Sequence, residues 1–202
     1  MRATRRCAAA ALLWLAAAAL PAAAQEFPAL YSVAGVAADD VLNIRSAPSA
    51  SAEIIGTLAP DQAGVEVVAA DGSGTWGLVN SGERSGWAAL RYLTRASTED
   101  GLALPRRFSC FGTEPFWILN ITQDGAADYA TPGGHTRLKA GRVLTSRNHG
   151  GHYLLPLEGG AGAVIRRSAC SDGMSDRTFG LSVDLFQLDT PDLQSGCCSL
   201  AP

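Results

Sequence analysis

Short apolar and β-branched segments, separated by turn-forming residues, dominate the chain between Val41 and Leu93. The segments read VLNIRSAPS, EIIGTL, VEVV, TWGLV, GWAAL and YL, and most of them are bounded by Gly, Pro, Asn, Asp or Ser. Runs of this length and composition are typical of short strands joined by tight turns. We therefore expect this part of the chain to form a small all-β barrel.

The order of these segments carries a family resemblance. The landmarks L-N-I-R-S-x-P-S, I-I-G-x-L, T-W, G-W and Y-L follow one another over about a quarter of the chain. In this order they resemble the bacterial Src homology 3 (SH3) domain. The resemblance implies a binding module of the cell envelope, because members of that family commonly attach to peptidoglycan or its stem peptides. It implies no reaction, since one fold hosts many functions.

The amino terminus has the pattern of a secretory signal peptide. Met1–Arg6 carries three arginines, Ala8–Leu20 is an unbroken apolar run of thirteen residues, and small residues continue to Ala24. A helix that spans a bilayer needs about 20 apolar residues, so this run is too short for an anchor. We expect cleavage near Ala24, no lipid on Cys7, no stable membrane span, and a periplasmic or secreted protein.

The charge of the expected mature chain limits its partners. Removal of the signal segment takes away three of the 16 basic residues and none of the 19 acidic ones, which leaves a net charge near −6. An acidic exported chain lacks the basic surface that nucleic acid and anionic lipid require. Peptidoglycan or an envelope protein is therefore the expected partner, and nucleic acid is not.

The remaining chain divides into two β-rich parts. We expect a signal peptide at residues 1–24, the SH3-like domain at 25–95, a linker at 96–107 and a second domain of unknown function at 108–202. In that second domain FWILNIT, VLTS, GHYLLPLE, AGAVIRR and TFGLSVDLFQL are expected strands. The predicted fold class is all-β: a small SH3-like barrel followed by a second, disulfide-stapled antiparallel β barrel or sandwich.

Two unusual motifs mark the second domain. They are Cys110-Phe-Gly-Thr-Glu-Pro-Phe-Trp117 and Cys170-Ser-Asp-Gly-Met-Ser-Asp176, followed by a strand and a late Gly-Cys. Together they resemble the signature of uncharacterised proteobacterial envelope proteins, many of them predicted lipoproteins. The resemblance implies an envelope location and assigns no function.

Four cysteines follow the signal segment: Cys110, Cys170, Cys197 and Cys198. An even number in an exported chain predicts disulfides. A bond between the neighbours Cys197 and Cys198 is the least favoured pairing, because their Cα atoms are only about 3.8 Å apart. Cys110 and Cys170 are therefore expected to pair with the other two, in either of two combinations.

Three aromatic residues of the first domain, Trp76, Trp87 and Tyr92, are candidate ligand-binding residues. Amphipathic rings in a small barrel often give one face to the core and a polar edge to a groove. Core packing is the alternative role. It is favoured for Trp87, whose G-W-A-A-L context is typical of a buried strand, and is left open for Trp76.

Asn43 and Arg45 are the polar candidates in the first domain. They alternate with Leu42 and Ile44, so they project from the opposite face of the same strand. The two-pronged guanidinium of Arg45 could hold a carboxylate of a stem peptide. The favoured alternative is an ion pair within the domain, to one of three nearby acids: Asp39, Asp40 and Glu53.

Glu114, Trp117, Asp172 and Asp176 are the candidate residues of the second-domain motifs. Paired carboxylates can work as acid and base, which would suit a cell-wall hydrolase. Building the local turn is the favoured role for the aspartates, because Asp-Gly is a strong turn signal. For Trp117, capping the barrel is favoured over an exposed recognition loop. No catalytic residue is assigned.

Neither a metal nor a cofactor is expected. His149 and His152 are three residues apart, but zinc needs at least a third protein ligand, and His135 lies beyond an apparent strand. The leading hypothesis is an exported, non-catalytic binding protein whose first domain binds peptidoglycan or its stem peptides. The alternatives are wall-hydrolase activity in the second domain and a secreted inhibitor of lytic enzymes.

Overall fold

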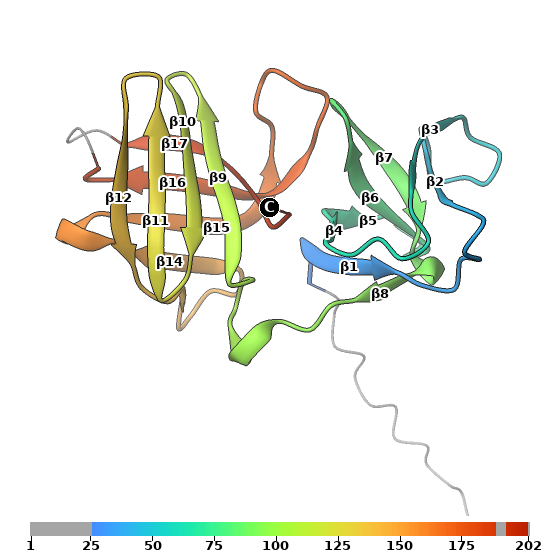
Figure 1. The fold of residues 1–202 in the computed structure, drawn as a ribbon, viewed down its shortest axis with the longest axis horizontal. Helices are drawn as coiled ribbons and strands as arrows, with labels where there is room; N and C mark the ends of the chain where they lie inside the picture. Colours follow the sequence, from blue (N-terminus) through green and yellow to red (C-terminus); the bar gives the residue numbers. More distant parts are fainter. Residues whose placement is uncertain (1–25, 189–192, 202) are drawn as a thin grey trace, which may run out of the picture.

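A computed structural model describes residues 26–188 and 193–201, so the expected signal segment and its cleavage site lie outside the described residues. These ranges form seventeen β-strands and three short 3₁₀ turns. None of the helical turns within them is long and apolar enough to cross a membrane. Figure 1 shows two β-rich modules side by side, which is the all-β architecture that the sequence predicts.

The first module is a small barrel of two sheets. Its strands are β1 (Ala29–Val33), β2 (Leu42–Arg45), β3 (Ile54–Leu58), β4 (Val65–Val67), β5 (Ala69–Ala70), β6 (Trp76–Ser81), β7 (Arg84–Ala89) and β8 (Leu93–Arg95). One sheet has the order β4-β1-β8 and the other β3-β2-β7-β6-β5. Tyr31, Ile44 and Val67 fill the space between the sheets and are at most 1% exposed. Burying such side chains is the main favourable contribution to a barrel of this size.

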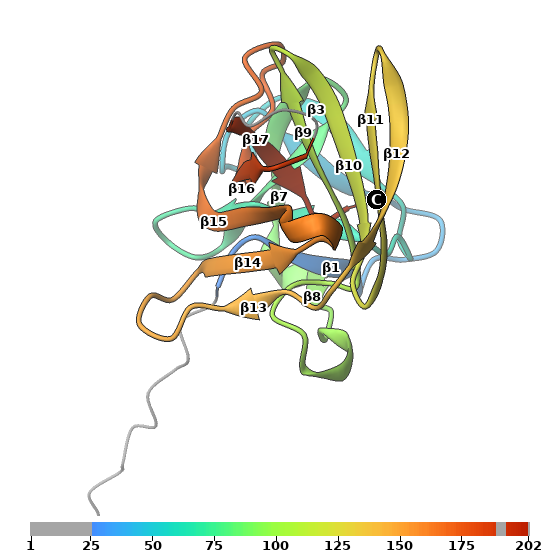
Figure 2. The same cartoon turned by 90° about the vertical axis from the view of Figure 1, so that its left-hand side faces the viewer.

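The second module is a single antiparallel sheet. Its strands are β9 (Arg107–Thr113), β10 (Phe116–Thr122), β11 (Gly125–Thr131), β12 (Gly134–Ala140), β13 (Leu144–Thr145), β14 (His152–Pro156), β15 (Gly162–Cys170), β16 (Phe179–Phe186) and β17 (Gln194–Ser199). They have the order β12-β11-β10-β9-β17-β16-β15-β14-β13, so β17 joins two meanders. A bridge between Ala140 and Leu157 brings the two ends of the sheet together. The module is thus a half-barrel, whose curl is visible in Figure 2.

Two glycines make room for Trp117 inside the half-barrel. Trp117 is 4% exposed and packs near the ring of Tyr129. A Cβ atom added at Gly112 on β9 would collide with the Trp117 indole, and one at Gly196 on β17 would collide with both that indole and the main chain of Phe111. The expected capping role of Trp117 therefore has a packing basis, since only glycine fits beside the ring.

Both disulfides end on β17. Cys110 of β9 is bonded to Cys198, and Cys170 at the end of β15 is bonded to Cys197. The prediction that Cys110 and Cys170 pair with the doubled cysteines is confirmed. Adjacent strand residues point to opposite faces. Cys198 accordingly lies in the core beside β9, whereas Cys197 reaches the outer face and the end of β15.

We predict that removing the two disulfides one at a time lowers the free energy of unfolding by unequal amounts. The bonds close loops of 88 and 27 residues, for which the loop-closure expression gives about 4.6 and 3.5 kcal/mol of stability. The double variant Cys110→Ala/Cys198→Ala should therefore have a lower free energy of unfolding than Cys170→Ala/Cys197→Ala. Guanidinium titrations of both variants measure it. Unchanged midpoints in both would contradict the stapling role of β17.

The segment expected to be a linker packs against the second module. It contains one 3₁₀ turn, Glu99–Gly101, and its last residue begins β9. Leu104 is fully buried in the half-barrel core. The buried Gln123 amide donates to the main-chain oxygens of Leu104 and Pro105, at 2.9 and 2.8 Å, and its oxygen accepts from the main chain of Val143 at 2.8 Å. This part of the chain is therefore attached to the second module.

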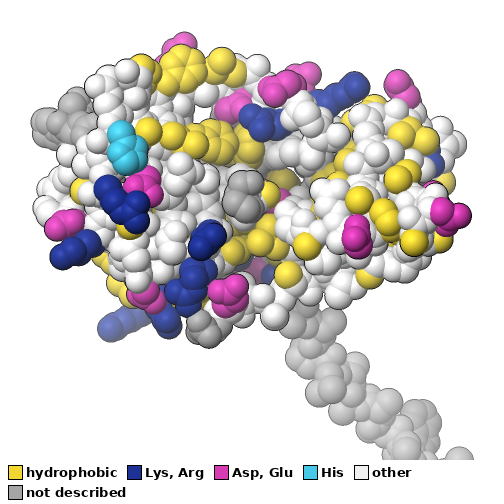
Figure 3. Space-filling model, viewed as in Figure 1, with side chains coloured by type: hydrophobic (Ala, Val, Ile, Leu, Met, Phe, Trp, Pro, Cys, Tyr) yellow, Lys and Arg dark blue, Asp and Glu magenta, His cyan; other side chains and the backbone are white. Residues whose placement is uncertain are grey.

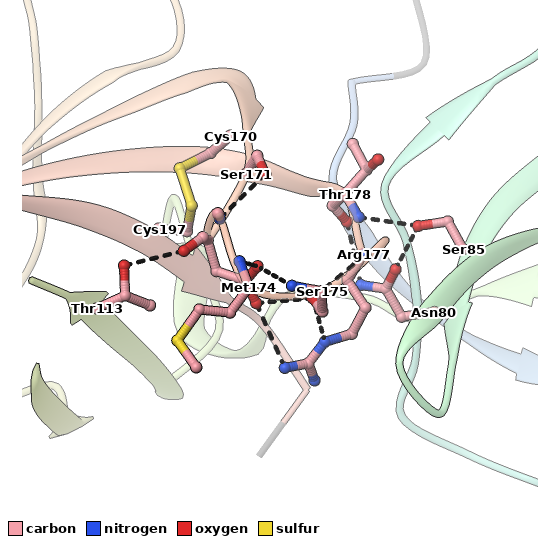
Figure 4. A network of polar contacts seen from close by, with 12 residues as sticks. Asn80, Ser85, Thr113, Cys170, Ser171, Met174, Ser175, Arg177, Thr178 and Cys197 are labelled. Carbon is pink, nitrogen blue, oxygen red and sulfur yellow. Dashed lines mark hydrogen bonds and ion pairs between the residues drawn. A yellow bond between two sulfur atoms is a disulfide. The ribbon is translucent and has the colours of Figure 1, made fainter.

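A loop of the second module docks on the first. Residues 171–178, between β15 and β16, lie against the β6–β7 hairpin (Figure 4). Asn80 donates to the Thr178 oxygen at 3.0 Å, and the Thr178 N–H donates to the Ser85 hydroxyl at 2.8 Å. The Asp176 main chain bonds to Glu83 and Ser85 at 2.9 and 3.2 Å. Several directional bonds thus fix how this loop meets the first module.

A buried carboxyl forms a second contact between the modules. Glu66 of β4 is 7% exposed and accepts a 2.6 Å hydrogen bond from the Ser199 hydroxyl of β17. Its Oε1 atom is buried without a hydrogen-bond partner among the described residues. Burial raises the pKa of the Glu66 carboxyl, and the hydrogen bonds from Ser199 and from the main chain of Leu200 and Ala201 offset this only in part.

We predict that Glu66→Gln removes a pH dependence of stability. A carboxyl whose pKa is higher in the folded state holds its proton more tightly there, so the folded state loses stability as pH rises through that pKa. Below the ordinary Glu pKa of about 4.3 this loss is absent. In thermal melts across the acidic and neutral range, the melting temperature of the variant should rise relative to that of the wild type as pH increases. The exposed Glu53→Gln is the control, and an equal gain there would contradict the prediction.

Candidate functional site

A pocket on the first module collects most of the residues that the sequence marks as ligand-binding. It has a volume of about 270 Å³ and lies between residues 35–41, strand β2, the start of β6 and the 3₁₀ turn before β8. Four of the five predicted residues line it: Asn43, Arg45, Trp76 and Tyr92. All four are half-buried, so their polar edges are available to a ligand.

Arg45 anchors the wall of the pocket. Its guanidinium donates to the main-chain oxygen of Ala52 at 2.7 Å. The favoured ion pair between Arg45 and a nearby acid was wrong. Within the described ranges Arg45 has no acidic partner, because the bend after β2 places the Ala52 carbonyl beside its guanidinium. The sequence gives no direct sign of this bond, since Ala52 is seven residues away.

Asp40 and Arg91 also line the pocket, and the sequence reasoning missed both as site residues. The Arg91 guanidinium lies 4.6 Å from the centre of the Tyr92 ring, a cation–π contact that leaves the arginine exposed. The sequence signal for Arg91 is its position directly before Tyr92, a candidate ligand-binding residue. Because Asp40 lines it too, the pocket presents both signs of charge beside two aromatic rings.

A tight turn positions Trp76. The carboxylate of Asp71 accepts hydrogen bonds from the main chain of Thr75 and Trp76, at 2.9 and 2.8 Å, and from Ser73. The hydrogen bond from the Ser73 hydroxyl, followed by that from the Trp76 N–H, lowers the pKa of Asp71 to about 2. Asp71 therefore stays ionised except in strong acid, and the turn that presents the indole persists.

Trp87 does not join the other candidates. It lies on β7, where its Cα pairs with Arg45 of β2 and with Leu78 of β6. Its side chain is half-buried, yet it does not line the pocket. Trp87 lies on a strand, as its G-W-A-A-L context predicts, but the favoured core-packing role was wrong. Its neighbours Gly86 and Ala88 are buried, whereas Trp87 alternates to the other face and lies outside the core of the first module.

Asp172 builds the loop that carries the second motif. Its side chain is 6% exposed and accepts from the main chain of Met174 and Ser175, at 3.0 and 2.9 Å, and from the Ser175 hydroxyl at 2.8 Å. Arg177 lies 3.6 Å away. Burial by itself would raise the pKa of Asp172, but these hydrogen bonds and the charge of Arg177 outweigh it and lower the pKa. A carboxylate held in this way is suited to building a turn.

Glu114, Asp176 and Trp117 have separate surroundings. Glu114 is exposed in the turn between β9 and β10, and the Asp176 side chain is exposed beside the first module. Trp117 is buried under its two glycines. Of the three acids in the motifs, only Asp172 is therefore enclosed, and its oxygens are occupied by its own loop.

The histidines do not converge. The rings of His149 and His152 stack with centres 5.4 Å apart, and His135 lies 3.6 Å from Asp128. Among the described residues there is no group of three or more His, Cys, Asp or Glu side chains that could hold a metal ion.

Comparison with known proteins supports the SH3-like interpretation of the first module. Residues 40–94 match the family model of the bacterial SH3 domain, a range that includes the six pocket residues named above. This segment is therefore similar to that family, and with two disulfides it indicates an extracytoplasmic protein. Comparisons with curated proteins and with solved structures gave no match. The envelope family suggested by the second-domain motifs remains an expectation.

We predict that Asp172→Ala destabilises the 171–178 loop. The change leaves two main-chain donors and Arg177 without their partner, which typically costs about 1–3 kcal/mol. Because the folded pKa of Asp172 is lowered, the stabilisation exists above the ordinary Asp pKa and is lost as pH falls through the lowered value. The stability gap between wild type and variant should therefore narrow in acid.

Urea titrations at neutral and acidic pH measure this gap. Asp176→Ala is the matched control, since it lies in the same loop with an exposed side chain. Substitutions of that kind usually change stability by less than about 0.5 kcal/mol. Equal losses in the two variants would show that Asp172 has no special structural role.

Proposed function

We propose that this protein is an exported, non-catalytic binding protein of the cell envelope, and that its first module binds peptidoglycan through the stem peptides. The observation that carries the proposal is the convergence of Asn43, Arg45, Trp76 and Tyr92 on one pocket. The match of residues 40–94 to the bacterial SH3 domain supports it independently.

The chemistry of the pocket suits a short peptide that carries both charges. Arg91 is exposed and can hold a carboxylate, while Asp40 can accept from an amine. The rings of Trp76 and Tyr92 offer flat apolar contact, and the Asn43 amide can bond to a peptide group. A volume of about 270 Å³ is slightly below the usual range for ligand pockets, so one or two residues of a stem peptide would fill it.

The alternative of a wall hydrolase depends on Glu114, Asp172 and Asp176. It has less support, because the Asp172 carboxylate is engaged by Ser175, Met174 and Arg177. General acid–base work needs a carboxyl that is free to reach the substrate. No residue of the described chain favours the inhibitor alternative. The sacculus experiments below distinguish both alternatives from peptidoglycan binding.

We predict that Trp76→Ala/Tyr92→Ala abolishes binding to isolated sacculi. Truncating a central aromatic anchor typically costs about 2 kcal/mol, or roughly 30-fold in affinity. The measurement is co-sedimentation of the purified mature protein with sacculi over a range of concentrations. Leu144→Ser is the control, because Leu144 is an exposed apolar residue of the second module.

Three results would redirect the assignment. Equal retention of the double variant would refute the pocket as the binding site. Release of soluble wall fragments by the wild type would favour the hydrolase. Slower wall lysis by added lysozyme, with no sedimentation of the protein, would favour the inhibitor.

A further inference from the structure

The two motifs of the second module meet at a groove that the peptide pocket does not use. The groove has a volume of about 500 Å³ and lies between the outer face of β9, β10 and β11 and the 171–178 loop. Glu83, in the β6–β7 turn of the first module, closes one side. The site is therefore built from both modules, and it accounts for motif residues that the proposed function leaves unused.

The floor and one wall of the groove are apolar and exposed. Phe116 and Ile118 point outward from β10 and are 52% and 39% exposed, and Met174 of the loop is 67% exposed. Hydrophobic side chains gather over this part of the second module in Figure 3. Soluble proteins rarely expose large apolar side chains together unless the surface binds something.

Several polar groups of the groove are already hydrogen-bonded within the protein. The Thr113 hydroxyl donates to the main-chain oxygen of Asp172 at 2.9 Å, and the Thr131 hydroxyl accepts from Gly133 at 3.3 Å. The Asp172 carboxylate is held by its own loop. A saccharide needs many free donors and acceptors, which this lining does not offer. The occupant should instead fill the groove with an apolar group.

One charge at the groove is left over. Arg177 lies 3.6 Å from Asp172 and 5.3 Å from the centre of the Phe179 ring, so its charge is balanced. Glu83 is exposed, and its carboxylate has no hydrogen-bond or ion-pair partner within the described ranges. The Glu83 carboxylate is therefore free to pair with a cation of the occupant.

We infer that this groove binds an extended polypeptide segment of a partner protein, with an apolar side chain as its anchor and a Lys or Arg beside it. The anchor lies on Phe116, Ile118 and Met174, and the cation faces Glu83. The Cys170–Cys197 disulfide begins the loop and the first module holds its far end, so the site is rigid before the segment arrives. Rigidity of this kind favours affinity, because little order is lost on binding.

Synthetic peptides test the inference on the intact mature protein. The probes are acetyl-Lys-Leu-Phe-Leu-Lys-amide, the same peptide with Glu in place of both Lys, and the Lys peptide with Ser at its three central positions. Calorimetry and amide chemical shifts are measured for each. The first probe should bind at least about 10-fold more tightly than either other one, and its shifts should map to β10 and the 171–178 loop.

Variants separate this site from the peptide pocket. Phe116→Ser and Ile118→Ser should each weaken the first probe by about 10-fold or more, and Glu83→Gln by about 3-fold. Leu144→Ser is the matched control, since Leu144 is 52% exposed, as Phe116 is, and does not line the groove. None of these variants should change sedimentation with sacculi.

Several outcomes would overturn the inference. These are no binding of the first probe, equal binding of the Glu peptide, and shifts that map outside the groove. Dimerisation of the free protein that Phe116→Ser abolishes would assign the surface to a second copy of the chain. Binding of zwitterionic lipid micelles at the same residues, without peptide binding, would assign it to a lipid.

Discussion

Strand β17 is the element on which the second module depends. It is the last strand along the chain, lies between β9 and β16, and pairs with both. Its neighbouring cysteines point to opposite faces, so one disulfide lies in the core and the other on the outer face. A strand with two small serines and a glycine has little apolar surface of its own to bury. The covalent bonds therefore supply the constraint that packing alone would not.

The same strand governs how the modules meet. Cys170, tied to β17, is the last residue before the 171–178 loop, which bonds to the β6–β7 hairpin. Ser199, the last residue of β17, bonds to the buried Glu66 of the first module. Two contacts with the first module thus start from one stapled strand. Burial raises the pKa of the Glu66 carboxyl at the second contact, whereas the loop contact is made of several hydrogen bonds.

The two proposed sites differ in their chemistry. The pocket of the first module mixes aromatic rings with both signs of charge, which suits a small polar peptide. The groove beside Phe116 is apolar with the unpaired Glu83 carboxylate at one side, which suits a side chain of a larger partner. If both are occupied, the protein would hold a polypeptide close to the wall and raise its local concentration there. Neither site requires a reaction.

The alternation of apolar and polar residues along the sequence was enough to predict several strands and the faces of their side chains. Period-two alternation identified β10 and β16, and the alternation of Asn43 and Arg45 with core residues placed both side chains on the pocket face. It failed for β12, an edge strand that is exposed along most of its length and so lacks alternation. It failed again for β17, where cysteines and small residues replace the usual apolar run.

What the sequence by itself determined is therefore the all-β class, the SH3-like segment and the pairing of Cys110 and Cys170 with the doubled cysteines. Only the tertiary structure decided which cysteine meets which, that Arg45 bonds to Ala52, and that Glu83 faces the second-module motifs across the groove. The physical reason is distance along the chain. Alternation and turn chemistry act between near neighbours, whereas these contacts depend on how the bend after β2 folds back and on how two separately built sheets come together.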